Sequence, residues 1–352
     1  MDQNRINDWI KKRRAHKQTL THDDILQGIL SGNNQVLSAA ITLLESTRTE
    51  DKKIARQLIQ SVLPHAGKSI RIGVTGVPGV GKSTFIESFG QYVIQKGHKI
   101  AVLAVDPSSE KSGGSIMGDK TRMNELSQSQ NAFIRPSAAG KSLGGVARKT
   151  REAIILCEAA GFDYILIETV GVGQSETVVH SMVDFFLLLM LAGAGDELQG
   201  IKRGIMEMAD CLVITKADGD NLKHAQKAKV QYQNAMHLFP PNANDWTPRA
   251  LVTSALNGVN LDKVYDTILS FQNHTKVNGS FDKKRRSQDK YWLHETIRDE
   301  LLQAFYAHPK IKETLKEVEQ QLVEKKCSSF EASDHLLSLY KKLTMDVKNK
   351  KE

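Results

Sequence analysis

The sequence predicts an α/β fold, a doubly wound and mostly parallel sheet flanked by helical segments at both ends of the chain. Between residues 66 and 280, short apolar runs alternate with amphipathic stretches. Runs that are apolar on both faces are typical of parallel strands covered by helices on each side of the sheet. Outside this region the periodicity is helical. We therefore expect an N-terminal helical segment (1–65), a sheet domain (66–280) and a C-terminal helical segment (281–352).

The N-terminal segment contains three expected amphipathic helices, whose apolar residues recur at i, i+3 and i+4. They are expected at residues 21–30, 35–46 and 52–63. Thr21 is placed to cap the first of them, and Asp23 and Asp24 follow in its first turn, where the helix dipole favours negative charge.

In the sheet domain, apolar runs predict strands and the amphipathic stretches between them predict helices. The strands are expected at residues 69–76, 99–109, 162–173, 183–195, 210–219 and 249–258. The helices are expected at residues 82–97, 144–161, 196–209, 220–239 and 260–273. Helical periodicity returns in the C-terminal segment at residues 291–309, 311–326 and 328–343. No internal repeat accompanies this alternation.

The composition is that of a globular protein with a basic balance. Hydrophobic residues make up 40% of the 352 residues and charged residues 25%, with a formal net charge of +8. The two basic runs, DKKRR at 282–286 and KNKK near the C-terminus, lack interleaved aromatic residues. We therefore expect them to be solvated linker and tail charges, and we expect no nucleic-acid partner.

Cysteine usage and hydropathy predict a cytoplasmic protein with no membrane partner. Cys157, Cys211 and Cys327 are far apart and odd in number, which favours buried thiols over a disulfide framework or a CxxC metal site. The N-terminus has no apolar region of the kind found in secretory signals. The longest apolar run, at 185–195, is shorter than the roughly 20 residues that a membrane span needs.

A glycine-rich segment follows the first expected strand and satisfies the pattern GxxxxGK[ST]. Its residues are Gly76, Val77, Pro78, Gly79, Val80, Gly81, Lys82 and Ser83, and Thr84 follows them. Glycines let successive backbone N–H groups point inward and form an anion nest. In such a loop Lys82 contacts the β- and γ-phosphates and the Ser83 hydroxyl is a ligand of Mg²⁺. The pattern predicts a bound nucleoside triphosphate.

Two later strands end in acidic residues. Asp106 closes one strand and is suited to holding Mg²⁺ directly or through water. Glu168, Thr169, Val170 and Gly171 close another and resemble a DxxG switch element with glutamate in place of aspartate. A glycine at position 171 lets its backbone N–H meet the γ-phosphate. Each acidic residue alone is equally consistent with a strand-end carboxylate facing solvent, whereas both after a phosphate loop favour a metal and switch site.

The residues at the end of a third strand predict which nucleotide base the site binds. Asp218 can accept hydrogen bonds from guanine N1–H and N2–H₂, a pair that adenine does not offer, so an unpaired buried carboxylate rejects ATP. Lys216 is expected to lie along the base, and Thr215 stands where asparagine is usual, which removes an amide contact. The backbone of Ser254, Ala255 and Leu256 is expected to receive guanine O6. These elements predict a GTPase rather than an ATPase.

With these motifs the chain resembles the methylmalonyl-CoA mutase-associated GTPase chaperones, also known as ArgK or LAO/AO transport-system kinases, a SIMIBI-class branch of the P-loop GTPases. The matching runs are RIGVTGVPGVGKSTFIE, LAVDPSS, GDKTRM, LGGVARKTREAI, ETVGVGQSE, AGAGDELQGIKRGIMEMAD and TKADGDN. The resemblance spans roughly residues 36 to 340. Its most specific pieces are VGVGQSE and GAGDELQGIKRGIMEMAD, which general GTPases lack.

The resemblance implies a homodimer that binds GTP with Mg²⁺, hydrolyses it slowly, and loads, protects or repairs a cobalamin-dependent acyl-CoA mutase. It implies nucleotide contacts at Gly76 through Thr84, at Asp218 and at Ser254 to Leu256. It implies metal and switch roles for Ser83, Asp106, Asp119 and Glu168. The reaction itself is expected to depend on Lys82, Glu168 and Gly171. The C-terminal segment is expected to dimerise.

The residues also predict slow hydrolysis. Ras-like enzymes carry a water-positioning glutamine directly after the DxxG glycine, whereas here Val172 follows Gly171 and Gln174 comes later. We expect a partner to order segments 107–123 and 139–150. Arg122 and Arg148 are candidates for stabilising charge in the transition state, with solvated loop arginines as the alternative.

Three other functions were weighed against a mutase chaperone. A kinase of an amino-acid transport system is disfavoured because the chain has no HRD-like catalytic base. A metallochaperone GTPase calls for clustered cysteine and histidine ligands, which the three cysteines and 11 histidines do not provide. A targeting GTPase that binds RNA and signal peptides calls for a Met-rich appended domain, and the nine methionines are scattered.

Overall fold

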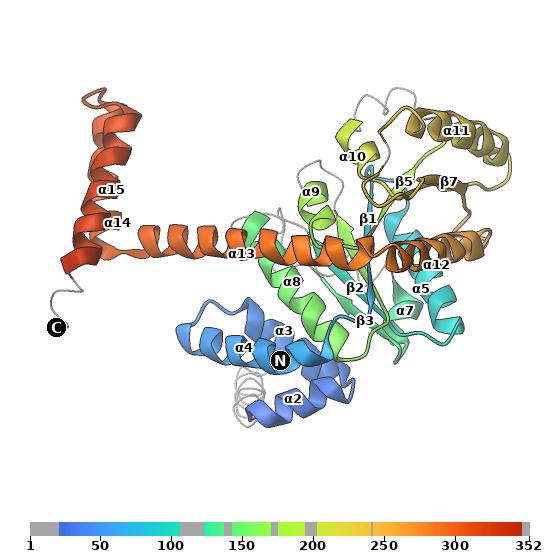
Figure 1. The fold of residues 1–352 in the computed structure, drawn as a ribbon, viewed down its shortest axis with the longest axis horizontal. Helices are drawn as coiled ribbons and strands as arrows, with labels where there is room; N and C mark the ends of the chain where they lie inside the picture. Colours follow the sequence, from blue (N-terminus) through green and yellow to red (C-terminus); the bar gives the residue numbers. More distant parts are fainter. Residues whose placement is uncertain are drawn as a thin grey trace, which may run out of the picture. The chain divides into compact units, whose positions relative to one another are not determined.

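The fold is built on one seven-stranded sheet (Figure 1). A computed structural model describes residues 21–105, 123–136, 143–169, 175–193, 203–240 and 242–346. The chain divides into two compact units, Met1–Asp289 and Lys290–Glu352. Across the described residues, no helix combines the length and the apolar composition needed to cross a bilayer.

The strands pair in the order β3-β2-β4-β1-β5-β6-β7, and every pairing is parallel. Their bounds are β1 Ile70–Gly76, β2 Ile100–Val105, β3 Ala132–Arg135, β4 Tyr164–Thr169, β5 Phe185–Met190, β6 Cys211–Ile214 and β7 Arg249–Val252. The chain winds outward on one side of β1 through β2 and β3, and on the other through β5, β6 and β7. The doubly wound sheet is therefore confirmed, and the end of β1 lies where ligands bind in such folds.

Helices cover both faces of the sheet (Figure 1). They are α5 Lys82–Gln95, α7 Asn124–Gln128, α8 Leu143–Ala159, α9 Ser175–His180, α10 Arg203–Glu207, α11 Asn221–Met236 and α12 Leu261–Val277. One core joins α5 and α12 to β1, β2, β4 and β5, with Phe85, Phe89 and Phe271 fully buried. A second core joins α10 and α11 to the opposite face of β5, β6 and β7. This burial holds the strand ends in fixed register.

The N-terminal helices pack against α8. They are α2 His22–Leu30, α3 Asn34–Glu45 and α4 Thr49–Val62, followed by the 3₁₀ turn η1 Leu63–His65. The expected cap of α2 is confirmed as a reciprocal capping box: the Thr21 hydroxyl accepts from the Asp24 N–H at 3.2 Å, and the Asp24 carboxylate accepts from the Thr21 N–H at 2.9 Å. Such a box satisfies two helix-end donors at once.

Three short elements that the structure describes in the sheet unit do not appear among the sequence predictions, β3, α7 and α9. Of these, α7 has five residues. β3 has four residues and pairs on one side with β2, so it lies at the edge of the sheet. α9 has six residues. Elements this short do not complete a periodic pattern, because one helical turn alone takes 3.6 residues.

The C-terminal helices are α13 Ser280–Ala307, α14 Pro309–Val323 and α15 Ser329–Asp346. The boundary between the two units falls inside α13. The second unit has a small apolar cluster of its own, Val318, Ala332 and Leu336, between α14 and α15. The helix α13 begins about a dozen residues before its predicted start, so the DKKRR run is helical.

The expectation that DKKRR is a solvated linker was wrong for two of its residues. Arg285 donates to both carboxylate oxygens of Asp184, at 2.8 and 2.7 Å, and to the Ser69 carbonyl at 2.7 Å. Lys284 donates to the Asp184 carbonyl at 2.7 Å. Asp184 is 1% exposed. A carboxylate this deeply buried needs a paired cation, and the first turns of α13 supply one.

Candidate nucleotide site

The glycine-rich loop connects β1 directly to α5, as the sequence predicts. Gly79 and Gly81 have φ values of 79° and 92°, a left-handed conformation that side chains with a Cβ rarely adopt. Gly81 is the N-cap of α5 and provides no side-chain hydrogen bond to the first helical turn. The N–H groups of that turn therefore lack a side-chain cap, which is the arrangement that favours a bound phosphate.

Lys82 folds back onto the loop that precedes it. Its ammonium donates to the Gly76 carbonyl at 2.8 Å and to the Val77 carbonyl at 3.3 Å. Since an ammonium group has three donors, one remains for a phosphate oxygen. The pKa of Lys82 lies below its usual range, because burial lowers it more than the charges of Glu168 and Glu176 raise it. The two carboxylates thus favour the charged form that a phosphate contact needs.

Strand register brings Glu168 to the phosphate loop. In β4, Glu168 pairs with Val74 of β1 on one side and with Ala104 of β2 on the other. Glu168 is buried, with 9% of its surface exposed. Ser83, the other candidate magnesium ligand among the described residues, is the second residue of α5. A carboxylate and a hydroxyl at the same edge of a parallel sheet are oxygen donors that fit Mg²⁺.

Several predicted residues lie outside the described ones. Asp106, Asp119, Arg122, Val170, Gly171, Val172 and Gln174 belong to this group. Asp106 directly follows Val105, which pairs with Thr169 in the sheet. The other charge-stabilising candidate, Arg148, is on α8 and donates to Glu152 one turn later at 3.2 Å.

Thr215 braces the phosphate loop from β6. Its hydroxyl lies 2.7 Å from the Val80 carbonyl and 3.2 Å from the Met190 carbonyl, and it is fully enclosed, with Thr215 at 2% exposure. Lys216 adds a second link, since its ammonium donates to the Gly79 carbonyl at 2.8 Å. Thr215 thus joins the residues that follow β6 to the loop that precedes α5.

Asp218 lies beside the segment after β7. The Ser254 hydroxyl donates to Asp218 Oδ1, and the Asn257 side-chain amide donates to the same oxygen at 3.3 Å. The Ala255 carbonyl accepts from the Ser88 hydroxyl of α5 at 2.8 Å. Leu256 is 79% exposed. The Asp218 carboxylate is therefore held in place by side chains of the segment after β7.

Sequence reasoning missed three residues that the structure adds to the site. Asn257 and Ser88 hold Asp218 and the segment after β7 through the contacts just given. Glu176 lies on α9, with Oε1 3.5 Å from the Thr75 hydroxyl. The run VGVGQSE contains Glu176, so the sequence carries a signal near this residue. Ser88 has no comparable signal in the sequence.

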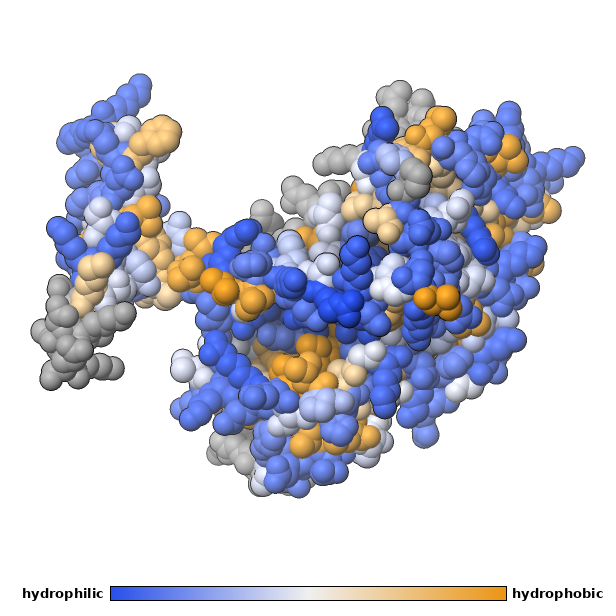
Figure 2. Space-filling model, viewed as in Figure 1, coloured by the Kyte–Doolittle hydropathy of each residue, from blue (hydrophilic) through white to orange (hydrophobic). Residues whose placement is uncertain are grey.

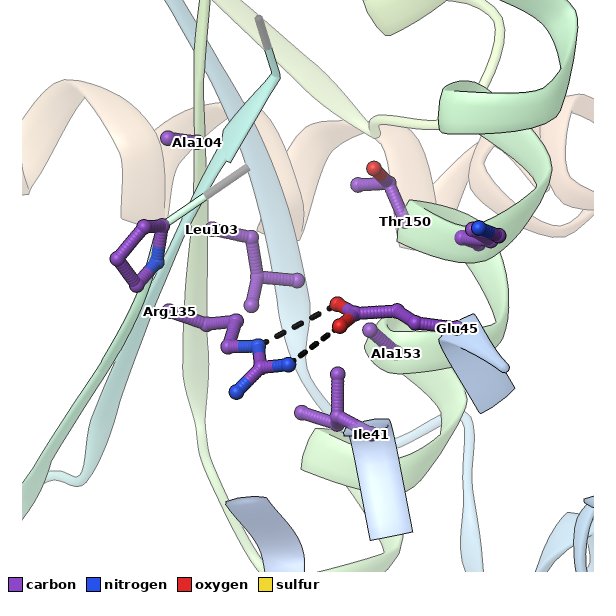
Figure 3. A pocket seen from close by; sticks show the side chains of 9 residues that line it. Ile41, Glu45, Leu103, Ala104, Arg135, Thr150 and Ala153 are labelled. Carbon is purple, nitrogen blue, oxygen red and sulfur yellow. Dashed lines mark hydrogen bonds and ion pairs between the residues drawn. The ribbon is translucent and has the colours of Figure 1, made fainter. Parts of the chain in front are cut away.

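A small pocket lies elsewhere, at the carboxyl ends of β2 and β3 beside α3 and α8 (Figure 3). Arg135 points across it to Glu45, with N–O distances of 3.3 and 2.5 Å (Figure 3). The guanidinium also donates to Thr42 at 3.3 Å. The ion pair of Glu45 with Arg135 therefore joins the N-terminal helices to the edge of the sheet at this pocket.

The described residues contain no group of three or more histidine, cysteine, aspartate or glutamate side chains that could together hold a metal ion. Cys157, Cys211 and Cys327 are free thiols. Burial raises the pKa of the Cys157 and Cys211 thiols, which keeps both protonated and unreactive.

Comparisons with known proteins agree with this geometry. Residues 37–310 match the family model described as methylmalonyl Co-A mutase-associated GTPase MeaB. A putative GTPase of Caulobacter vibrioides is 49% identical over 90% of this chain and 97% of its own length. The mitochondrial methylmalonic aciduria type A homolog of Mus musculus is 46% identical over 91% of this chain and 79% of its own.

The chain is also similar to a solved structure. A crystal structure of an LAO/AO transport system kinase superposes with a TM-score of 0.71 and 34% identity, covering 91% of this chain and 98% of the other. The similarity therefore extends over the sheet domain and most of the flanking helices.

Proposed function

This chain belongs to the MeaB family of methylmalonyl-CoA mutase-associated GTPases, and we propose on that premise that it is a GTP-driven chaperone of a cobalamin-dependent acyl-CoA mutase. It would assist cofactor loading, protection or reactivation of that mutase. Its GTPase activity follows from the family and the fold. The observation that carries the proposal is the contact of the phosphate loop with the segment that contains Asp218, through the hydrogen bond from the Thr215 hydroxyl to the Val80 carbonyl.

The site recognises its nucleotide at two ends. Backbone N–H groups of the glycine loop and the Lys82 ammonium bind the phosphates, and the Asp218 carboxylate accepts from the guanine edge. When bound, Mg²⁺ neutralises charge on the β- and γ-phosphate oxygens. Ser83 and Glu168 would hold it, with Asp106 and Asp119 as further proposed ligands.

Within this cycle the residues of the chain supply binding and orientation more than proton transfer. The position that holds a water-orienting glutamine in Ras-like enzymes is Val172 here. We therefore propose slow intrinsic hydrolysis that rises when the mutase binds. The γ-phosphate would then act as a switch, because contacts that exist only in the triphosphate state change the surface offered to the partner.

We further propose a homodimer formed through the C-terminal unit. Large apolar side chains are exposed on α13, and Figure 2 shows hydrophobic residues gathered along this helix. Leu293, Ile297 and Leu301 are 59%, 48% and 61% exposed and recur every four residues, so they lie on one helical face. An exposed apolar stripe of this kind is a candidate for helix pairing. A cytoplasmic location is also proposed, supported by the three free cysteines.

The test uses purified chain and purified methylmalonyl-CoA mutase. Complex formation is measured by analytical size exclusion with a non-hydrolysable GTP analogue, with GDP and without nucleotide, and GTP turnover is measured with and without mutase. We expect the complex to depend on the nucleotide and turnover to rise severalfold. Asp218→Asn is the matched control, since it weakens guanine recognition while leaving the sheet intact. Absence of a complex in all three states would contradict the proposal.

A second candidate function is a kinase of an amino-acid transport system. It is favoured by one observation, the 34% identity to a structure that carries that description. The measurement is transfer of labelled γ-phosphate from GTP or ATP to an amino-acid-binding protein. Label on the binding protein would support the kinase, whereas release of inorganic phosphate alone supports the GTPase.

A further inference from the structure

Glu176 is a buried carboxylate close to the phosphate loop, and the nucleotide and magnesium contacts proposed above do not include it. It is the second residue of α9 and is 1% exposed. Among the residues that the structure describes, its Oε2 atom has no hydrogen-bond partner. A buried carboxylate oxygen without a donor costs free energy. A position that tolerates this cost near a reaction site is a candidate for a functional role.

Glu176 ends a chain of three buried side chains. The Thr169 hydroxyl donates to Thr75 Oγ1 at 2.8 Å, and the Thr75 hydroxyl donates to Glu176 Oε1 at 3.5 Å. Thr75 and Thr169 are each 1% exposed. Because a carboxylate only accepts, it orients both hydroxyl protons toward itself. Hydrogen bonds linked in this way, away from water, polarise and strengthen one another. We call these three residues the relay.

The relay connects three parts of the nucleotide site. Thr75 is the last residue of β1 before Gly76, where the phosphate loop begins. Thr169 directly follows Glu168, the candidate magnesium ligand on β4. Glu176 approaches both from α9. The position of Glu168 relative to the phosphate loop is therefore set by strand pairing and also by the relay.

The charge of Glu176 reaches the loop as well. Burial lowers the pKa of Lys82, and both Glu168 and Glu176 raise it through their charges. Glu176 thus lies close enough to influence the ammonium group without a direct hydrogen bond to it, since the ammonium donates to Gly76 and Val77. An interior carboxylate acting over such a distance is weakly screened.

We propose that Glu176 is a positioning residue for GTP hydrolysis, which acts through Thr75 and Thr169 to hold Glu168 in place against the phosphate loop. The inference rests on GTP hydrolysis at this site, and it does not depend on which mutase is the partner.

The two sides of the site then respond differently to loss of the relay. Diphosphate binding depends on the loop N–H groups, on Lys82 and on Asp218, and these contacts persist without Glu176. Hydrolysis also needs correctly placed groups around the γ-phosphate, and Glu168 is one of these groups. A small displacement there costs catalysis far more than binding, because geometric precision matters most in the transition state.

The experiment compares Glu176→Gln, Thr75→Val and the double variant with the wild-type chain. It measures kcat and KM for GTP, the dissociation constant for GDP, and the melting temperature. Each single variant is expected to lower kcat about tenfold or more while the GDP dissociation constant changes less than about threefold. The double variant should resemble the more impaired single one, because both break the same relay.

Two further variants serve as controls. Thr75→Ser keeps the hydroxyl and is expected to recover most of the kcat that Thr75→Val loses. Ser175→Ala removes a neighbouring buried hydroxyl that has no partner among the described residues, and it is expected to leave kcat unchanged.

Three results would overturn the inference. They are a kcat of Glu176→Gln within about twofold of wild type, a parallel loss of kcat, GDP binding and melting temperature, and single effects that multiply in the double variant. A wild-type chain that binds GTP without turning it over contradicts the GTPase activity itself, and that outcome is separate because it appears before any substitution is made.

Discussion

Replacing Thr215 by valine tests whether this residue couples the two ends of the nucleotide site. The change keeps the shape of the side chain and removes one hydroxyl, whose proton is shared between the Val80 and Met190 carbonyls at 2.7 and 3.2 Å. Val80 is fully buried, so water does not replace the lost donor. Leaving a buried carbonyl without its donor costs about 1–3 kcal/mol.

That cost translates into a measurable loss of affinity. If the whole free-energy cost destabilises the loop conformation that binds nucleotide, the apparent dissociation constant rises between about fivefold and 150-fold. We expect about tenfold, equal for GDP and for a GTP analogue, since both share the contacts concerned. The preference for guanine over adenine should not change, because the hydroxyl of Thr215 faces Val80 rather than the base.

Isothermal titration calorimetry of wild type, Thr215→Val and Thr215→Ser measures this effect. Thr215→Ser retains the hydroxyl and should bind within about threefold of wild type. The reasoning is refuted if Thr215→Val binds GDP as tightly as wild type, or if it loses guanine preference while keeping affinity. The second result would mean that Thr215 acts on the base directly.

Other consequences can be measured independently. Asp218→Asn should reduce the preference for GDP over ADP at least about 100-fold by competition titration. Arg285→Met should destabilise the fold by about 3–5 kcal/mol in urea unfolding, because it leaves the buried Asp184 charge unpaired. Burial raises the pKa of Asp210 from 3.8 to about 6, so its favourable contribution is present below pH 3.8 and is lost as the pH rises through 6. Relative to wild type, Asp210→Asn should therefore gain up to about 3 kcal/mol between pH 4 and 7. Leu301→Asp should shift the proposed dimer to monomer in sedimentation experiments.

Long periodic segments and complete motifs were predictable from the sequence. The strands β2, β5 and β6 consist of apolar residues and the strands β1, β4 and β7 are mostly apolar, because helices cover both faces of the sheet. The phosphate loop was identified for a different reason, since its glycines occupy conformations that other residues avoid. Both signals are local, so they survive without knowledge of the tertiary structure.

Contacts between segments far apart in the sequence were not predictable. The bond from Thr215 to Val80 spans 135 residues, and the bond from Ser88 to Ala255 spans 167. The sequence shows Thr215 where asparagine is usual. Its hydrogen bonds to Val80 and Met190, however, follow only from the position of β6 beside β5. The sequence around Arg285 predicts a solvated linker charge, because nothing local indicates that Asp184 lies opposite to it.

The central claim is that one nucleotide is held at two ends, with its phosphates on the glycine loop and its guanine at Asp218. The most direct measurement is calorimetric titration of the wild-type chain with GDP and with ADP in the presence of magnesium. We predict one GDP site per chain and binding of ADP at least about 100-fold weaker. Equal affinity for the two nucleotides, or binding of neither, would contradict the claim.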